Sequence, residues 1–494
     1  MTRVATRLAV LTAALALASC SIPPKPDAPP LRNEAPLAGI GVAHGGAWPE
    51  TEWWKRYRDA QLDALEQKAL AAAPTLDEAR QRFGTAMRSI DIARAAGGAS
   101  VQANAQVQRL RMSENGLIPS QFLGFTWYNQ GDLSLQFQYD FDFWGKTRAA
   151  VAAAVDEARA AEAERSAAAL MLTTAVADTY FGWQADQTRL ALARESVAAL
   201  ERSRLLTEKR TARGIDTPDL LHQADARLAG ARELEAAYAG SAPIRLAALA
   251  ALLGVAPAEL PELTAKPLPT VDAALPDDVG IDLLARRPDI AANRWRVEAA
   301  LRRVDQARAE FYPDISLGAM AGFSSIDLDK LVNADSRVFG VGPALHLPLF
   351  ALSRLNAQYG ASQAQLKTAA AAYDASVVDA ARDVATQALN LKQLDARRHE
   401  RERQVDATLR LQGVVTARAQ RGLVDDRRLL EAQTDLLQQR DAAATLAADA
   451  IAAEIALTKA LGGGYRRDEA TRISATETST GDAAPPADTP TRSQ

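Results

Sequence analysis

The chain contains a single cysteine, Cys20, among its 494 residues, and only four histidines. One cysteine excludes disulfides within the chain and any zinc site built from several cysteines. The histidines lie far apart in the sequence and show no metal-ligand spacing. We therefore expect no metal centre and no bound cofactor.

The sequence also lacks a strong excess of charge of one sign. The formal net charge is −4, and removal of two arginines near the N-terminus, Arg3 and Arg7, changes it to −6. Such a mild charge gives no basis for a nucleic-acid partner. A nucleophile elbow, a P-loop and paired carboxylates in a pocket-forming context are missing too, so the sequence does not favour an enzyme.

Long apolar runs are missing after residue 20. Residues 1–19 carry Arg3, Arg7 and the apolar segment Leu8–Ala18, which is too short to span a bilayer and is typical of a bacterial secretion signal. No uninterrupted apolar stretch of 18 residues follows, so we expect any bilayer crossing to use β-strands. The residues Leu17-Ala18-Ser19-Cys20 resemble a lipobox, whose cysteine carries diacylglycerol; the alternative is an ordinary signal peptide with an incidental cysteine.

Proline is absent from two long stretches that are rich in helix-forming residues. Lys146–Arg213 has 68 residues and Ser353–Arg421 has 69, and each predicts one continuous helix, the first about 100 Å long. Each stretch ends in Arg-Gly and is followed by a shorter predicted return helix, from Pro218 to about Gly254 and from Asp426 to Gly462. Gly214 is a predicted left-handed C-cap, and Thr217 a predicted N-cap.

The second long helix also carries a coiled-coil pattern. Apolar positions alternate in steps of four and three, with Gln387 as the one interruption. They are Leu366, Ala370, Tyr373, Val377, Ala380, Val384, Leu391 and Leu394.

Four other stretches alternate apolar with polar or small residues, which is typical of amphipathic β-strands. The predicted strands are 101–108, 133–143, 315–323 and 338–350, with loops at 113–131 and 324–336. Because bacterial barrels have long loops outside and short turns in the periplasm, we expect the loops to lie outside and the helices in the periplasm.

The two halves of the chain repeat one order of elements. The segment DIARAAGGASV (91–101) aligns with DQARAEFYPDI (305–315), and strands, a long helix and a shorter helix follow both. The predicted organisation is a signal peptide (1–19), a lipid anchor with a proline-rich tether (20–50), a first repeat (51–254), a linker (255–280), a second repeat (281–464) and a disordered tail (465–494).

The chain resembles the outer-membrane factor (TolC-like) family, in the lipoprotein branch that serves resistance-nodulation-division (RND) efflux pumps. The resemblance covers nearly the whole mature chain. Besides the lipobox at Cys20, the matching segments are WWKRYRDAQLDAL (53–65), FDFWGKTRAA (141–150), RRPDIAANRWRVEAAL (286–301), FYPDISL (311–317) and GPALHLPLF (342–350).

The resemblance implies a mainly α-helical fold with β-strands: a trimeric 12-stranded transmembrane β-barrel, four strands per chain, continued by a long coiled-coil tunnel in the periplasm. The strand count by itself requires an oligomer, because about eight strands are needed to close a barrel and open edges are unstable in lipid. The protein would lie in the outer membrane, lipid-anchored, and extend into the periplasm.

The function implied is a passive exit duct of a tripartite RND-type efflux pump for drugs or other small molecules. Its partners would be a periplasmic adaptor and an inner-membrane RND pump. A channel for type I protein secretion or for heavy-metal efflux stays open as an alternative. A periplasmic adaptor would share the long helices but would lack the two strand pairs.

Several residues are candidates for the channel wall and the gate. The lipid-facing candidates are Leu133, Leu135, Phe137, Phe141, Leu345 and Leu347, and the lumen-facing candidates are Gln136, Gln138, Asp140 and His346. Tyr139, Phe143 and Trp144 would belong to the periplasm-side aromatic girdle. In the family the far tip of the helices constricts the pore, where Asp425, Asp426 and Glu431 would form an acidic ring. Helix capping is the alternative for Asp425 and Asp426, with Arg427 and Arg428 as their counter-ions.

We predict that the mature protein begins at acylated Cys20. Cys20→Ala should impair sorting to the outer membrane more than folding, because a closed barrel holds the protein without the acyl chains. Mass spectrometry of the mature N-terminus and membrane fractionation of the variant test this. An unmodified residue other than Cys20 at the N-terminus would contradict it.

Overall fold

The computed structural model separates the chain into two compact units, which we describe in turn. The first unit contains residues 84–160 and 294–372 with the segment up to Leu31, and the second contains 32–83, 161–293 and the residues from Tyr373 onward. Residues 22–25, 27–37, 39, 41, 44–113, 124–271, 274–277, 279–348 and 351–466 are described. Cys20 and most of the predicted tail lie outside them.

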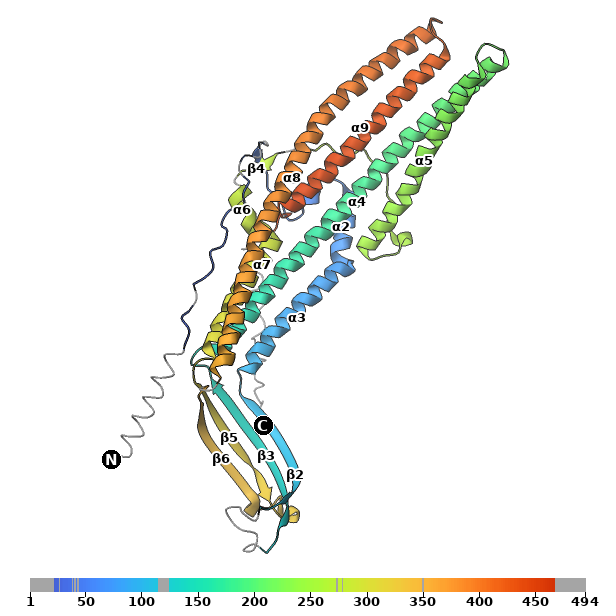
Figure 1. The fold of residues 1–494 in the computed structure, drawn as a ribbon. Helices are drawn as coiled ribbons and strands as arrows, with labels where there is room; N and C mark the ends of the chain where they lie inside the picture. The colour runs from blue at the N-terminus through green and yellow to red at the C-terminus, as the bar shows by residue number, and fades with distance from the viewer. Residues whose placement is uncertain are drawn as a thin grey trace, which may run out of the picture. The chain divides into compact units, whose positions relative to one another are not determined.

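The first unit is built on one four-stranded antiparallel sheet in the order β2-β3-β5-β6 (Figure 1). The strands are β2 (Ser100–Arg111), β3 (Trp127–Phe141), β5 (Asp314–Ser325) and β6 (Arg337–His346). The short helices η4 (Leu328–Lys330) and η5 (Ala334–Ser336) connect β5 to β6. Strands β2 and β6 form the two edges of this sheet, which agrees with Pro343 in β6, since proline cannot donate to a neighbour.

The predicted loop at 113–131 is wrong at its C-terminal end. Residues Trp127–Gly131 belong to β3 and pair with Val107–Arg111 of β2. Gly131 pairs with Val107 and Ser325, and leucines cover the position: a Cβ built there would lie 2.8 Å from Leu328 and 3.1 Å from Leu331. A glycine that makes room for neighbouring side chains looks like a loop signal when only the sequence is known.

Two predicted strands end earlier than expected. Strand β3 ends at Phe141, so Phe143 and Trp144 lie in the connection to α4 (Lys146–Ala212). Strand β6 ends at His346, which leaves Leu347 half-buried beyond the strand, and Leu349 lies outside the described residues. The predicted end of this strand at residue 350 is therefore wrong, because the strand ends before the apolar alternation does, and the lipid-facing assignment of Leu347 stays a prediction.

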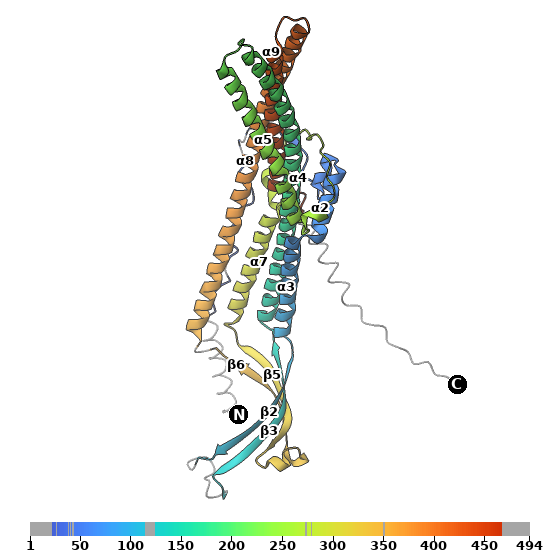
Figure 2. The same cartoon turned by 90° about the vertical axis from the view of Figure 1, so that its right-hand side faces the viewer.

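The long helices are confirmed to within a residue or two. The second long helix is α8 (Leu352–Gln420), and the return helices are α5 (Pro218–Leu253) and α9 (Asp426–Ala460). In the second unit α5 returns along α4, and α9 returns along α8 (Figures 1 and 2). Helices α3 (Pro74–Ala96) and α7 (Pro288–Ala309) precede the two strand pairs, so the predicted duplication of elements is confirmed.

The coiled-coil positions of α8 are buried as predicted. Leu366, Tyr373, Val384 and Leu394 are buried, whereas Gln387 is only half-buried. Its neighbour Ala388 is buried at that turn. The helix therefore keeps a continuous apolar stripe by one small local shift.

The core of the second unit begins with the tryptophans of η1 (Trp53–Tyr57) and the helix α2 (Ala60–Ala72). Trp53, Trp54, Leu62 and Leu65 are buried, and the Trp53 indole donates to Thr173 of α4 at 3.3 Å. The unit also contains η3 (Pro257–Glu259), α6 (Val279–Arg286) and the parallel pair β1 (His44–Gly46) and β4 (Leu275–Pro276).

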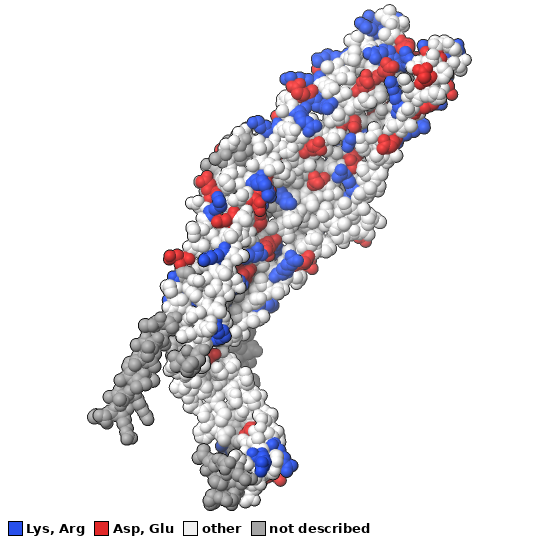
Figure 3. All heavy atoms as spheres, viewed as in Figure 1, with Lys and Arg blue, Asp and Glu red and all other residues white. Residues whose placement is uncertain are grey.

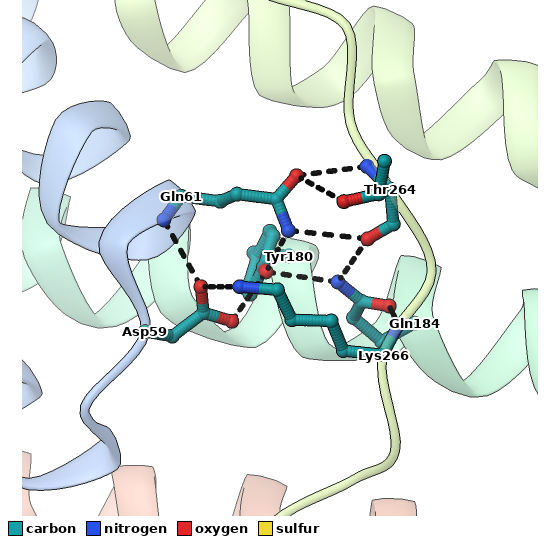
Figure 4. A network of polar contacts seen from close by, with 6 residues as sticks. All are labelled: Asp59, Gln61, Tyr180, Gln184, Thr264 and Lys266. Atoms are coloured by element: carbon teal, nitrogen blue, oxygen red, sulfur yellow. Dashed lines mark hydrogen bonds and ion pairs between the residues drawn. The ribbon is translucent and has the colours of Figure 1, made fainter.

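A polar network joins α2, α4 and the segment after η3 (Figure 4). The Tyr180 hydroxyl donates to the Asp59 carboxylate at 2.6 Å, and Lys266 donates to its other oxygen at 2.7 Å. Gln61 and Gln184 both donate to the Thr264 carbonyl. Burial alone would raise the pKa of Asp59, but the hydrogen bonds from Lys266 and Tyr180 outweigh it and hold the pKa below its usual value.

The described part of the proline-rich tether is held against the helices. In the first unit, the Arg308 guanidinium donates to the Pro23 carbonyl at 2.9 Å and the Tyr359 hydroxyl to the Pro24 carbonyl at 2.7 Å. In the second unit, the Arg32 amide donates to Asp374 at 2.9 Å. The described tether residues are thus attached to helices far away in the sequence.

One described helix, α5, is long and apolar enough to cross a membrane by length and composition. The sequence argument missed it because that argument required an uninterrupted apolar run, and α5 contains Arg245. This arginine forms an ion pair with Asp186 of α4, which attaches the apolar part of α5 to a neighbouring helix.

Glu66 of α2 is fully buried, and neither of its oxygens has a hydrogen-bond partner among the described residues. Burial raises the pKa of Glu66 to about 9 from its usual value of 4.5. The folded chain therefore keeps a proton that the unfolded chain releases above that usual value. The stability associated with Glu66 is thus fully present at low pH and decreases as the pH rises towards 9.

We predict that Glu66→Gln removes this pH dependence, because the amide carries no charge to bury. Relative to the variant, the free energy of unfolding of the wild-type chain should fall by at most about 1.4 kcal/mol per pH unit across that interval. Denaturant unfolding at pH 5 and pH 8 measures it, with the exposed Glu195→Gln as control. Equal pH profiles for the wild type and Glu66→Gln would refute the prediction.

Candidate functional site

The sheet of the first unit separates apolar from polar side chains by its register. Residues that pair across antiparallel strands project from the same face. One row therefore joins Val101, Phe137, Ala319 and Val341, and the next joins Ala103, Leu135, Ala321 and Phe339. Further rows add Leu133 with Phe323, and Phe141 with Ile315 and Leu345.

This apolar face is exposed in the single chain. Val341 is 76% and Phe339 is 87% exposed, although both are large apolar residues. The visible surface of the sheet is mostly uncharged, whereas the helices carry both signs (Figure 3). Exposed apolar surface of this extent marks a face that is covered by lipid or by protein.

The opposite face is mostly polar or small, with Met320 and Val338 among its apolar residues. Gln136 lies between Gln102 and Met320, and Asp140 lies beside Ser316. Gln138 and His346 lie on this face as well. All of the lipid-facing candidates within strands thus lie on one face of the sheet, and the lumen-facing candidates lie on the other.

Aromatic side chains gather where β3 meets α4. The rings of Tyr139 and Phe141 are 5.0 Å apart, and those of Phe141 and Phe143 are 5.6 Å apart. The Trp144 ring stacks on Tyr312 at 4.6 Å, and its indole donates to the Pro313 carbonyl at 2.9 Å. Asp142 accepts from the amides of Thr147 and Arg148, which caps the start of α4. The predicted girdle residues are therefore close together, although only Tyr139 belongs to the strand.

At the tip of the second unit, the two helix-to-helix turns have the same geometry. Gly214 and Gly422 both have φ of +70°, as expected for glycine C-caps. In each turn the residue after the glycine donates its amide to a carbonyl five residues earlier: Ile215 to Arg210, and Leu423 to Arg418. Both apolar side chains are exposed. Thr217 occupies the N-cap position of α5, but its side chain makes no capping hydrogen bond.

The three acidic candidates at the tip, Asp425, Asp426 and Glu431, make different contacts within the chain. Asp425 is the N-cap of α9, since its carboxylate accepts from the Arg428 amide at 3.1 Å. Asp426 is an exposed residue of the first turn. Glu431 pairs with the Arg428 guanidinium at 3.2 Å, and Arg427 lies 4.0 Å from Asp425. Capping is therefore confirmed for Asp425, and arginines accompany two of the three carboxylates.

The ion pair of Arg210 with Asp216, which the sequence argument missed, closes the first turn. The guanidinium donates to both carboxylate oxygens, at 2.8 and 3.0 Å. This hydrogen bonding lowers the pKa of Asp216. The signal in the sequence was an arginine and an aspartate on either side of the glycine turn.

A polar contact at Arg189 connects the first repeat to the second. Arg189 of α4 donates to Asp441 of α9 at 2.9 Å and also contacts the Tyr238 hydroxyl of α5. Its guanidinium lies over the Tyr238 ring, 4.3 Å from the centroid. Arg189 and Asp441 are more than 200 positions apart in the sequence, so no local pattern predicts their contact.

A groove runs between α4, α5 and the first turns of α9, with a volume of about 840 Å³. Its wall includes Arg227, Glu233, Arg427 and Glu431, together with small residues such as Gly230. Within the described part of the chain, no group of three or more His, Cys, Asp or Glu side chains is arranged to hold a metal ion. The groove is therefore lined by side chains of both charges.

The comparison with known families gives one match, in two segments. The model of the family described as outer membrane efflux protein matches residues 65–255 and 281–463. The chain belongs to the outer membrane efflux protein family. Each match contains one strand pair with its long and return helices, so the family model matches the chain once per repeat.

Relatives of known identity agree with this assignment. The multidrug resistance outer membrane protein MdtP of Shigella flexneri is 34% identical over 449 residues, which cover 90% of this chain and 91% of MdtP. The crystal structure of the outer membrane protein VceC of Vibrio cholerae is 34% identical, has a TM-score of 0.74 and covers 85% of this chain and 100% of VceC. The outer-membrane channel OprN is 25% identical, with a TM-score of 0.79 over 90% of this chain and 99% of OprN.

Proposed function

We propose that this member of the outer membrane efflux protein family is the outer-membrane duct of a tripartite efflux system. The observation that carries the proposal is the four-stranded sheet with one exposed apolar face, one polar face and two edge strands. In hydrocarbon every strand needs a partner on both sides, so the sheet must be closed by other copies. Three chains supply twelve strands, and the polar face then lines the lumen.

The duct carries its substrate passively, and selection lies with the pump. The relatives named for multidrug resistance favour small-molecule drugs as cargo. An inner-membrane RND pump and a periplasmic adaptor are the partners, and the groove beside α9 with the exposed Ile215 and Leu423 is the surface for the adaptor. A channel for type I protein secretion or heavy-metal efflux is the alternative.

The lipid anchor at Cys20 supplements the barrel. Hydrogen bonds to Pro23 and Pro24 hold the tether close to its start, which limits how far the acylated residue reaches. An anchored and inserted protein is attached to the outer membrane in two independent ways.

Leu135→Arg should strongly disfavour insertion, because it places a charge on the lipid-facing side of β3. A cost of about 2–4 kcal/mol is expected for an arginine near the bilayer midplane. The matched control is Gln136→Arg, one residue further along the same strand but on the lumen face. Folding into lipid vesicles, followed by urea titration, measures both. An equal loss for the two variants would contradict the face assignment.

Neutralising the tip carboxylates should reduce cation preference if three chains form an acidic ring there. The variant is Asp425→Asn/Asp426→Asn/Glu431→Gln, and asparagine at 425 preserves the N-cap. A ring of carboxylates attracts cations and excludes anions, so its removal should lower the permeability ratio of cations to anions.

Single-channel recording in planar bilayers measures this ratio. The control is Glu195→Gln, an exposed carboxylate on α4 that lies outside the tip. Unchanged conductance and selectivity in the triple variant would leave capping and local ion pairing as the roles of these residues. Wild-type protein that forms no pores at all would contradict the proposed function itself.

A further inference from the structure

A cavity of about 570 Å³ lies in the first unit between the start of α4, the end of α7 and the tether. Its lining contains four cationic side chains, Lys25, Arg148, Arg302 and Arg308, and one carboxylate, Asp305. Four positive charges against one negative charge leave a net charge of +3. A cavity with this lining attracts an anion.

The carboxylates nearby compensate only part of this charge. Lys25 lies 3.4 Å from Asp305, and Arg148 lies 3.4 Å from Asp142. Arg308 donates through Nε to a neutral partner, the Pro23 carbonyl. The Nε of Arg302 is buried and has no hydrogen-bond partner among the described residues, although Asp156 lies 3.8 Å away. Three nearby carboxylates thus face four cations, and Arg308 is the cation among them whose hydrogen bond goes to a neutral partner.

Aromatic side chains form the other wall. Trp144 stacks on Tyr312, and Phe143 is 59% exposed beside them. Tryptophan and tyrosine with one apolar side and one polar atom are typical of the interface between a bilayer and water. Cations next to such a wall match a ligand that has both an anionic headgroup and acyl chains.

The position of the cavity next to the sheet determines where it lies relative to the membrane, an inference that rests on the proposed function. The cavity begins just after β3 ends at Phe141 and just before β5 begins at Asp314. If the sheet spans the outer membrane, the cavity lies at its periplasmic surface. Cys20 is five residues before Lys25, so an acyl chain there is at most about 18 Å away along the extended chain.

We propose that this cavity binds the phosphate headgroup of an anionic phospholipid in the periplasmic leaflet of the outer membrane. Arginine guanidinium groups are suited to phosphate, because they donate paired hydrogen bonds in a fixed geometry. The diacylglyceryl group of the chain's own anchor has ester oxygens that accept hydrogen bonds but carries no charge, so it would leave the cations of the cavity without a counter-ion. The bound lipid joins α4, α7 and the tether at the membrane surface.

Native mass spectrometry of the purified, delipidated full-length protein tests the proposal. The probes are phosphatidylglycerol, phosphatidylcholine and inorganic phosphate, each titrated separately. The variants are Arg302→Gln and Arg308→Gln. The control is Arg303→Gln, on the same helix but outside the cavity, where Arg303 pairs with Glu157.

Phosphatidylglycerol should bind more tightly than phosphatidylcholine. Each cavity variant should weaken it by at least about tenfold, or about 1.4 kcal/mol, while Arg303→Gln leaves it unchanged. Equal binding of the two lipids, or equal binding by the wild type and the cavity variants, would overturn the proposal. Inorganic phosphate that binds as tightly as the lipid would also overturn it, since the site would then be one for free phosphate.

Conductance measured on the same preparations separates this proposal from the proposed function. Selective lipid binding by a protein that forms no pores would refute the proposed duct function and support the lipid site. Pore formation together with unselective lipid binding would support the duct function and refute the lipid site.

Discussion

The pairing of backbone hydrogen-bonding groups in hydrocarbon is the constraint on which this protein depends. One chain supplies a sheet whose strands β2 and β6 are edges and whose apolar face is exposed. The unpaired edges are unstable in lipid, and the apolar face is unstable in water. The sheet is therefore a part of a larger barrel, and the oligomer follows from the same physics as the fold.

The two repeats form the same turn between long helix and return helix, but with different residues. Both long helices end in a glycine with the same left-handed φ, yet the next helix starts with Thr217-Pro218 in one repeat and with Asp425-Asp426 in the other. In the second repeat the carboxylate of Asp425 makes the capping hydrogen bond, and in the first the Thr217 side chain makes none. The first turn is instead closed by Arg210 and Asp216. A constriction built from both turns therefore has inequivalent halves.

Charged groups at the two ends of the helices have different environments. At the tip, arginines and carboxylates pair with each other at short range. At the end next to the sheet, cations surround a cavity whose lining has too few carboxylates to match them. Glu66 is a third case, a buried carboxyl group that has no hydrogen-bond partner in the part of the chain that the structure describes and whose raised pKa keeps it protonated at neutral pH. Burial and the number of available partners, more than the residue type, decide what each charge does.

The sequence by itself determined the elements that depend on local patterns. The two long helices, their glycine caps, the duplication and the alternation in β3 follow from periodicity and turn chemistry, which act over a few residues. The family resemblance indicated the channel function, and the family match agrees with it. Helix and strand ends were less predictable: Gly131 looked like a loop residue, and Leu347 like a strand residue.

Only the tertiary structure decided the contacts between distant segments. The register that places Leu135 beside Ala103 and Ala321, the contact of Arg189 with Asp441, and the attachment of the tether to Arg308 join residues far apart in the chain. The same holds for the cavity, whose cations come from three segments. Hydrogen bonding and burial depend on distances in space, and a pattern along the chain contains no information about which distant side chains will share a site.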